Sequence, residues 1–272
     1  MPYKVAKNAG DEVLNPRGEI ILRTLGEQKQ FSLDEMKSLA FDTYVLPADE
    51  IVPLLQLAYS SESGALLAAK DRRISRALEI LKPWNHRSAP DSAAYTYIYF
   101  WGRAYQDLFS DEMFERFVDY SRHTIDIHSA EEQALARQAF AEALNRMQRD
   151  FGKTEIPWGE VNTVSRGGQF PLDGTGLYDV LHPDDGPQEP DGKISSDDGW
   201  GHMMVVEEEN PKKVWSLLPY GESEDPRSPH YNDQAKLHSE RQLKRFWFTP
   251  QEILAHTESV RGNRNRLRPP SR

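Results

Sequence analysis

The chain has 272 residues, a formal charge of -10 and no cysteine. Its length allows one large domain or two ordinary ones, and the missing cysteine excludes disulfides, thiolate metal sites and a cysteine nucleophile. The acidic balance argues against nucleic acid as a partner, because phosphate neutralisation needs clustered Lys and Arg, and no segment approaches the roughly 20 apolar residues of a membrane span.

The two terminal segments bear on location and on the charge balance. Residues 1–7 lack the apolar stretch of a signal peptide, so the chain as written is expected to stay in the cytosol. The tail from Arg261 to Arg272 is basic, unlike the rest of the chain. We interpret it as a solvated terminus and not as a nucleic-acid arm.

The first part of the chain, residues 1–152, shows helical patterns. Ser32 is followed three positions later by Glu35, and this capping box predicts a helix that runs through Ala40. A further apolar-periodic run, which begins at Asp49 or Pro53, predicts a second helix.

Three more helices are predicted before residue 152. Pro83 should end a short helix over residues 75–81. The segment 91–109 is rich in aromatic residues, and its alternating tyrosines permit a strand, but the neighbouring alanines favour a buried helix whose aromatic side chains serve packing. Residues 131–150 have the strongest helical propensity, with apolar side chains on one face.

The pattern changes to strand and loop between Gly152 and Pro157. Strands are predicted over residues 160–164, 203–207 and 213–218, separated by connections rich in glycine and proline. Thr249 followed by Pro250 predicts the cap and the first position of a final helix.

Two histidines lie close in sequence to the acidic segment 184–199. A metal-dependent hydrolase could use His182, Asp184, Asp197 and His202, because such side chains ligate zinc or hard cations. Their spacing fits no metal motif, and Asp-Gly and Pro-Asp sequences are typical of turns. We therefore favour a long, exposed polar loop without a metal site.

Ser223 is the only serine in a context that suggests a nucleophile, because Gly221 stands two positions before it. The nucleophile elbow of hydrolases also needs a glycine two positions after the serine, where this chain has Asp225. Residues 224–226 predict a turn instead. These residues alone indicate a mixed α/β protein without specifying a reaction.

Residues 220–234, with the sequence YGESEDPRSPHYNDQ, resemble a motif of the penicillin acylases and acyl-homoserine-lactone acylases. In that family a Gly-Gln-Ser stretch precedes Ser-Pro-His-Tyr-x-Asp-Gln near the carboxyl terminus. Residues 157–168 and 198–207 are similar to the preceding family blocks, and residues 15–43 resemble the region after the oxyanion-hole asparagine. The resemblance extends from about residue 15 to about residue 255.

This resemblance implies an N-terminal-nucleophile hydrolase. Such enzymes cut themselves before a serine, and the freed α-amine, with an ordinary pKa of about 7.7–8.0, then serves as the base. Backbone and asparagine donors stabilise the oxyanion. Met1-Pro2 offers no hydroxyl nucleophile and no Gly-Ser pair occurs in the chain, so the serine and the oxyanion asparagine are expected upstream of residue 1.

Arg17 is the candidate site residue that the resemblance supplies. It stands where a family arginine supports the oxyanion asparagine and the amine of the nucleophile, and a permanently charged guanidinium suits such positioning. Alternatively, residues 15–18 form a turn with a solvated arginine. The calcium ligands of the family lie mostly upstream, and the acidic ligand expected shortly before Arg17 is not evident. The resemblance therefore implies no metal and no cofactor for this chain.

Two residues of the terminal motif invite comment. Glu222 replaces the usual glutamine, which should change a hydrogen-bond network because a carboxylate cannot donate. His230 is tempting as a base, but the family base is the terminal amine. We therefore expect residues 228–233 to be structural, with His230 tying a loop to the sheet.

These observations predict an α+β fold that forms part of an αββα sandwich, with a mainly helical part over residues 1–152. Residues 153–272 would form a strand-rich part that completes the sheets and ends in a helix and the basic tail. The expected function is that of an acylase fragment for linear amides, such as β-lactam side chains or acyl-homoserine lactones, which is inactive alone because it lacks the nucleophile.

The alternative function is a non-catalytic scaffold or subunit that binds an upstream acylase polypeptide. The expected partners are that polypeptide, comprising the α subunit and the N-terminal part of the β subunit, and a small amide substrate. The location would be periplasmic if the chain is part of an exported full-length acylase.

Overall fold

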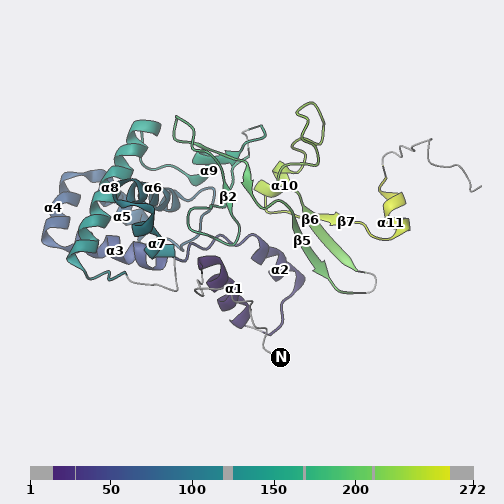
Figure 1. The fold of residues 1–272 in the computed structure, drawn as a ribbon, viewed down its shortest axis with the longest axis horizontal. Coiled ribbons are helices and arrows are strands. Elements are labelled where there is room, and N and C mark those ends of the chain that lie inside the picture. The colour runs from purple at the N-terminus through teal and green to yellow at the C-terminus, as the bar shows by residue number, and fades with distance from the viewer. Residues whose placement is uncertain (1–14, 28, 119–124, 168–169, 210–211, 258–272) are drawn as a thin grey trace, which may run out of the picture.

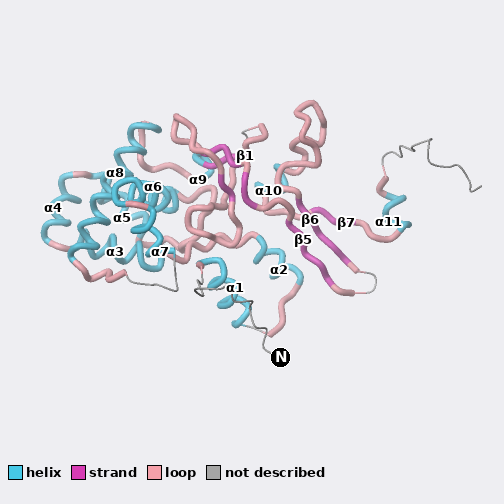
Figure 2. Tube along the Cα trace, in the orientation of Figure 1, coloured by secondary structure: helices cyan, strands magenta, loops and turns pink. Residues whose placement is uncertain are grey.

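The computed structural model describes residues 15–27, 29–118, 125–167, 170–209 and 212–257. A body of helices lies at one end of an elongated molecule, and a three-stranded sheet lies towards the other end (Figure 1). Long loops connect the two (Figure 2). The predictions for residues 1–7 and for the basic tail fall outside the described residues.

Within the described residues, the helical body consists of six helices that share one apolar core. They are α3 (Ala48–Ser60), α4 (Glu62–Lys70), α5 (Arg72–Leu81), α6 (Ala93–Phe109), α7 (Asp111–Val118) and α8 (Ala130–Phe151). The central helix α6 packs along α8 and against α7, and α3 packs on the other part of α8. The indole of Trp101 is fully buried and donates a hydrogen bond to the carbonyl of Ala136 at 3.1 Å.

The helix predictions for this body are confirmed. The aromatic segment is helical because Ser92 caps it through the backbone N–H of Tyr95 and because its aromatic side chains are buried all round the helix. α5 starts earlier than predicted, since Asp71 caps it. Pro53 lies inside α3, so the alternative that it opens this helix is wrong; the helix begins at Ala48.

Two further helices, α1 (Pro16–Glu27) and α2 (Leu33–Ala40), lie below the middle of the molecule in Figure 1. The capping box predicted for α2 is present: the hydroxyl of Ser32 accepts from the backbone N–H of Glu35, and the Glu35 carboxylate accepts from the backbone N–H of Ser32. α1 begins where Asn15 accepts a hydrogen bond from the N–H of Gly18 at 2.9 Å. The predicted turn over residues 15–18 is therefore the first turn of a helix.

After residue 157 the chain forms short strands, short helices and loops. In chain order they are α9 (Trp158–Val161), β1 (Asn162–Val164), β2 (Asp184–Asp185), β3 (Ile194–Ser196), β4 (Asp198–Gly199), β5 (Met203–Glu207), β6 (Lys213–Leu217), α10 (Ala235–Ser239), β7 (Lys244–Phe246) and α11 (Pro250–Ala255). β1 pairs in parallel with β3, β2 pairs antiparallel with β4, and β5, β6 and β7 form an antiparallel sheet. We call this region, from α9 to α11, the strand-rich part.

Two predictions for the strand-rich part need correction. The strand predicted over residues 160–164 begins only at Asn162, because Pro157 ends the extended chain and Trp158 starts a helical turn that buries its ring. The segment 184–199 is not one exposed loop, since it contains β2, β3 and β4 and buries Asp184, Ile194 and Ser196. The predictions of β5, β6 and the Thr249-capped helix α11 are confirmed.

The three-stranded sheet carries α2 on one of its faces. Phe41, the C-cap residue of α2, forms a small apolar cluster with Met203 of β5 and Leu217 of β6. The ammonium of Lys37 lies 4.1 Å from the centre of the Trp215 ring. Since Met203 and Leu217 are paired in the sheet, these contacts identify the face that the helix covers.

The secondary structure confirms the α+β class with a helical first half and a strand- and loop-rich second half. The described strands form one three-stranded and two two-stranded sheets, which agrees with a partial sandwich. None of the helices in the described ranges has both the length and the apolar character that a bilayer span requires.

Candidate functional site

A buried cluster of two histidines and two aspartates lies where β2, α10 and the loop before β2 meet. The Nδ1 atom of His182 lies 3.2 Å from Oδ1 of Asp173, and its Nε2 atom lies 3.1 Å from Nε2 of His238. The same nitrogen of His238 lies 3.2 Å from Oδ1 of Asp184. All four side chains are at most 4% exposed. We call these four residues the histidine–aspartate cluster.

Backbone contacts position this cluster. The N–H of His182 donates to the carbonyl of Asp42 at 2.9 Å, and the ring of Phe41 packs edge-on against the His182 ring with centres 5.1 Å apart. The N–H of Gly174 donates to Oδ2 of Asp184 at 3.1 Å. A side chain at residue 174 would collide with the backbone of residues 182 and 184, so this glycine permits the close approach.

His238 reaches the cluster from the buried face of α10, which also carries Ala235. Beyond the helix, Arg241 adopts a left-handed φ of 55°, a conformation that costs a non-glycine residue about 1–2 kcal/mol. Its guanidinium forms an ion pair with the carboxylate of Asp173. The turn after α10 thus brings a cation to the outer side of the cluster.

Charge inside the cluster shifts two pKa values in opposite directions. Burial alone lowers the pKa of His182, but the carboxylates of Asp184 and Asp173 outweigh it, so the pKa is raised. Burial alone raises the pKa of Asp184, but His182, His238 and the Gly174 N–H outweigh it, so this pKa is lowered. Attraction between histidine and carboxylate thus outweighs the effect of burial on the pKa of both His182 and Asp184.

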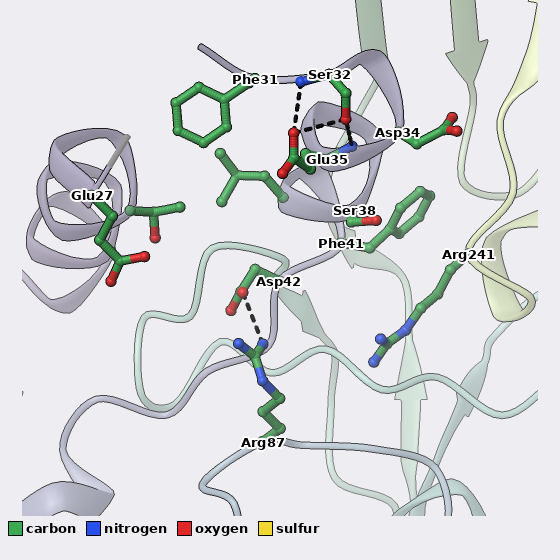
Figure 3. Close-up of a pocket in the computed structure, with 12 residues that line it drawn as sticks. Glu27, Phe31, Ser32, Asp34, Glu35, Ser38, Phe41, Asp42, Arg87 and Arg241 are labelled. Atoms are coloured by element: carbon green, nitrogen blue, oxygen red, sulfur yellow. Dashed lines mark hydrogen bonds and ion pairs between the residues drawn. The ribbon is translucent and has the colours of Figure 1, made fainter. Parts of the chain in front are cut away.

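An open pocket of about 640 Å³ adjoins the cluster (Figure 3). Glu27 of α1 and Glu35 of α2 lie on two of its sides, and the guanidinium groups of Arg87 and Arg241 point towards it. Arg87 is fixed by an ion pair to Asp42 at 2.8 Å. Since Arg241 also pairs with Asp173, this arginine connects the pocket with the histidine–aspartate cluster.

The structure changes the metal-ligand set proposed from the sequence. It brings His182 and Asp184 together, but Asp197 and His202 are exposed and belong to no group of three neighbouring ligands within the described residues. The third member of the neighbouring group is His238, which the sequence interpretation missed. The available signal was a histidine three positions after Ala235 on the apolar face of a short helix, and neither Asp173 nor Arg241 carried any sequence signal.

Arg17 lies in the first turn of α1, with its side chain 35% exposed. Its Nη2 atom pairs with Asp179 at 2.7 Å and its Nε–H donates to the carbonyl of Val180 at 3.1 Å. Two contacts on one planar group fix its orientation. The alternative of a solvated arginine in a turn is therefore wrong, whereas its role beside a nucleophile stays a prediction.

The terminal motif is held to the sheet by a residue other than the expected one. His230 is 60% exposed, and its Nδ1 lies 2.8 Å from Asp233 in the same loop. The buried side chain of Gln234 instead accepts from the N–H of Leu218, just after β6, at 3.0 Å. His230 therefore does not tie the loop to the sheet with this contact, and Gln234 does.

The surroundings of Glu222 accommodate a carboxylate at the position where the family motif has glutamine. Its carboxylate accepts from the amide of Gln234 at 3.2 Å and from the ammonium of Lys244 at 2.5 Å. The hydrogen bond and the charge of Lys244 keep the pKa of Glu222 below its usual range. A carboxylate fits here because β7 supplies a cation for it.

No described serine hydroxyl is hydrogen-bonded to a histidine side chain. The one group of three neighbouring ligands found in the described part of the chain contains two histidines.

Comparison with known proteins finds relatives that align with most of the chain. Acyl-homoserine lactone acylase PvdQ of Pseudomonas fluorescens is 26% identical over 261 residues, covering 90% of this chain and 32% of the relative. The protein of that name from Pseudomonas syringae pv. syringae is 26% identical, covering 86% of this chain and 30% of the relative. The chain thus spans about a third of the length of these relatives.

A solved structure and a family model were also matched. A thermostable penicillin G acylase from Alcaligenes faecalis aligns with 99% of this chain and 56% of its own, at 14% identity and a TM-score of 0.49. The penicillin amidase family model matches residues 1–255. Because this match spans nearly the whole sequence, the chain belongs to the penicillin amidase family.

Proposed function

We propose that this chain forms the carboxyl-terminal part of an acylase that cleaves linear amides between an acyl group and an amine. β-Lactam side chains and acyl-homoserine lactones are the substrate classes. The observation that carries the proposal is the match of the penicillin amidase family model to residues 1–255. The names of the two Pseudomonas relatives support the second substrate class.

In this proposal the nucleophile comes from an acylase segment upstream of the chain, and the chain alone is inactive. Amide cleavage by a serine needs a neighbouring base, and no described serine hydroxyl contacts a histidine side chain. Residues 1–152 would form the helical part of the assembled enzyme and residues 153–272 its strand-rich part.

One face of the three-stranded sheet supports a contact with such a segment. Side chains alternate between the two faces of a sheet, and α2 covers the face with Met203 and Leu217. The opposite face exposes Met204 by 54%, Val206 by 40% and Phe246 by 46%. Neighbouring exposed apolar residues of this kind are typical of an interaction surface. We assign this sheet face to the upstream acylase segment.

Arg17 is the residue that we assign to the assembled site. Asp179 and Val180 hold its guanidinium, and the side chain remains partly exposed, so it can meet a group from another segment. There it would position the oxyanion asparagine and the terminal amine of the nucleophile, which needs a fixed charge and several donors. It would act through those groups and would not contact the substrate itself.

The test compares the purified chain alone with the chain co-expressed with the acylase segment encoded upstream. Hydrolysis of an acyl-homoserine lactone and of a chromogenic acyl anilide is measured for both preparations. We expect turnover only from the combination. Turnover by the chain alone would contradict the proposal, and formation of a stable complex without turnover would establish the non-catalytic subunit in its place.

Matched variants locate the two proposed contacts. In the combination, Arg17→Ala should lower kcat by roughly 100-fold, the scale of a misplaced catalytic group, whereas Arg23→Ala on the same helix should leave it unchanged.

Met204→Glu should weaken the complex in a pull-down assay, whereas Leu66→Glu, at an equally exposed position of the helical body, should not. Equal effects within either pair would remove that contact from the proposal.

A further inference from the structure

The geometry of the histidine–aspartate cluster points to a metal site. We propose that His182, Asp184 and His238 bind one divalent transition-metal ion, with zinc as the ion that the donor set favours. The ion would fasten α10 to β2 and the preceding loop. This site is separate from the amide-cleaving chemistry, and its existence does not depend on it.

The spacing of the ligand atoms fits a tetrahedral ion. Zinc binds nitrogen at about 2.0–2.1 Å and carboxylate oxygen at about 2.0–2.2 Å, so two ligand atoms of a tetrahedral site lie about 3.3–3.5 Å apart. The Nε2 atoms of His182 and His238 are 3.1 Å apart, and Nε2 of His238 is 3.2 Å from Oδ1 of Asp184. One ligand atom from each residue lies within 4.8 Å of the other two.

The surroundings have the form that metal ligands require. Histidines that ligate a metal usually donate their second ring N–H to a carboxylate or carbonyl, which fixes the ring and its tautomer. Nδ1 of His182 faces Asp173 at 3.2 Å, and Asp173 is in turn paired with Arg241. Asp184 accepts from the N–H of Gly174 through the oxygen that does not face His238. Asp184 is thus oriented from behind by a hydrogen bond, whereas Nδ1 of His182 lies beside the Asp173 carboxylate without hydrogen-bond geometry.

The same contacts are poorly explained by hydrogen bonds alone. Nε2 of His238 lies near both Nε2 of His182 and Oδ1 of Asp184, and one N–H can point fully at only one acceptor. A cation placed between the three converging lone pairs satisfies them together.

The burial of the site indicates a structural ion. The side chains of His182, His238 and Asp184 are each at most 1% exposed, and the ring of Phe41 packs against His182. α10 is a helix of only 5 residues, which is too short to be stable by itself. An ion that joins it to β2 would hold this helix, and with it the Arg241 side chain at the edge of the pocket.

The experiment measures metal binding by the full chain without any activity assay. The purified chain is dialysed against a chelator and then titrated with Zn²⁺ by calorimetry, and with Co²⁺ while visible absorbance is recorded. We expect one equivalent of either ion per chain, the intense visible bands of tetrahedral Co²⁺, and a higher Tm with Zn²⁺. Binding below one equivalent without tetrahedral bands would show that the cluster is a hydrogen-bonded histidine pair.

Variants then locate the bound ion. His238→Ala and Asp184→Asn should abolish stoichiometric binding, and Asp173→Asn should weaken it about 10–100-fold, as expected for a residue that orients a ligand. His202→Ala removes an exposed histidine and is the matched control, so it should bind as the unaltered chain does. Loss of binding in His202→Ala, or its survival in folded His238→Ala, would overturn the assignment.

Circular dichroism of each variant after chelator treatment shows whether the variant is folded, and only folded variants are used to locate the ion. If His238→Ala and Asp184→Asn do not fold, the Co²⁺ spectrum of the unaltered chain and the 10–100-fold weakening in Asp173→Asn decide the proposal. Tetrahedral bands with one equivalent bound support it, and their absence rejects it.

Discussion

The helical body and the strand-rich part are held together by different contacts. In the helical body, one continuous apolar cluster joins α3 to α8. The same cluster extends into the strand-rich part through Trp158, Val161, Tyr178, Val180 and Ile194. The other apolar clusters of that part are small, one around Val164 and one that joins Met203 and Leu217 to Phe41, and they alternate with buried polar side chains. These polar residues are Asn162, Asp173, Thr175, His182, Asp184, Ser196, Ser216, Gln234 and His238.

The two regions therefore differ in the contacts that stabilise them. Apolar burial is non-directional and tolerates small shifts, and it dominates the helical body. Buried polar groups require defined partners, and an unpaired one costs about 1–3 kcal/mol. The strand-rich part therefore depends more on specific pairs.

The largest expected effect is that of alkaline pH, which should destabilise mainly the helical body. Burial raises the pKa of Tyr59, Tyr99 and Tyr105 in the helical body to about 12. In the strand-rich part it raises the pKa of Tyr178 and Tyr220. A raised folded-state pKa contributes stability that is fully present below the unfolded value of about 10 and is lost as the pH rises through about 12. We expect the helical circular-dichroism signal to be lost over this interval.

The check is a parallel record of phenolate absorbance and helical signal against pH. Buried tyrosines should ionise together with the loss of helix, well above pH 10. If all 11 tyrosines titrate near pH 10 while the helical signal persists, the aromatic core is not closed to solvent in the way described.

The second largest effect is expected from Trp101→Ala, which opens a cavity in the core of the helical body. Trp101 is fully buried, and removing a buried aromatic side chain lowers the free energy of unfolding by about 3–5 kcal/mol. Urea unfolding followed by circular dichroism measures the loss. Leu66→Ala, at a side chain that is 55% exposed, is the control and should change the value by less than about 0.5 kcal/mol.

A smaller effect is expected from Gln234→Ala in the strand-rich part. The substitution leaves the N–H of Leu218 without its acceptor and removes a donor to Glu222. The free energy of unfolding should fall by about 1–3 kcal/mol. Gln242→Ala, in which an exposed glutamine is truncated, serves as the control. A loss no larger than that of Gln242→Ala would show that this loop is held by other contacts.

The smallest effect is expected from Glu222→Gln, which restores the residue usual in the family motif. The pair with Lys244 is partly exposed, with side chains 53% and 38% accessible, so it contributes about 0.2–1 kcal/mol and is screened by salt. Because Lys244 lowers the pKa of Glu222, this contribution is present at neutral pH and is lost as the pH falls into the range where carboxylates protonate.

Unfolding in low and high salt tests the pair. The unaltered chain should lose a little stability as salt rises, and Glu222→Gln should lose less. An identical salt dependence of both proteins would mean that the ion pair does not contribute.

Much of the fold could be predicted because its signals are local. The capping boxes at Ser32 and Thr249 lie within four residues of chain, and they form with the partners that the sequence places beside them. The apolar periodicity of α8 likewise needs only its own 22 residues. For the same reason the family motif in residues 220–234 is recognisable from its run of neighbouring residues alone.

The candidate site could be predicted only in part, because its members are far apart in sequence. His182 and Asp184 are close neighbours along the chain, but His238 lies 56 positions after His182 and Arg241 lies 68 positions after Asp173. An Asp-Gly sequence such as 185–186 has the same local signature in an exposed turn as in a partly buried strand. The prediction of an exposed segment 184–199 was wrong for that reason.

The sequence by itself determined the family, the helices with their caps, and the change from helical to strand-rich structure near residue 157, because each is encoded by neighbouring residues. Only the tertiary structure decided which polar side chains are buried together, which sheet face α2 covers, and that Gln234 fastens the terminal motif to the chain just after β6. Those choices depend on the packing of segments that are distant along the chain, and no local pattern specifies it.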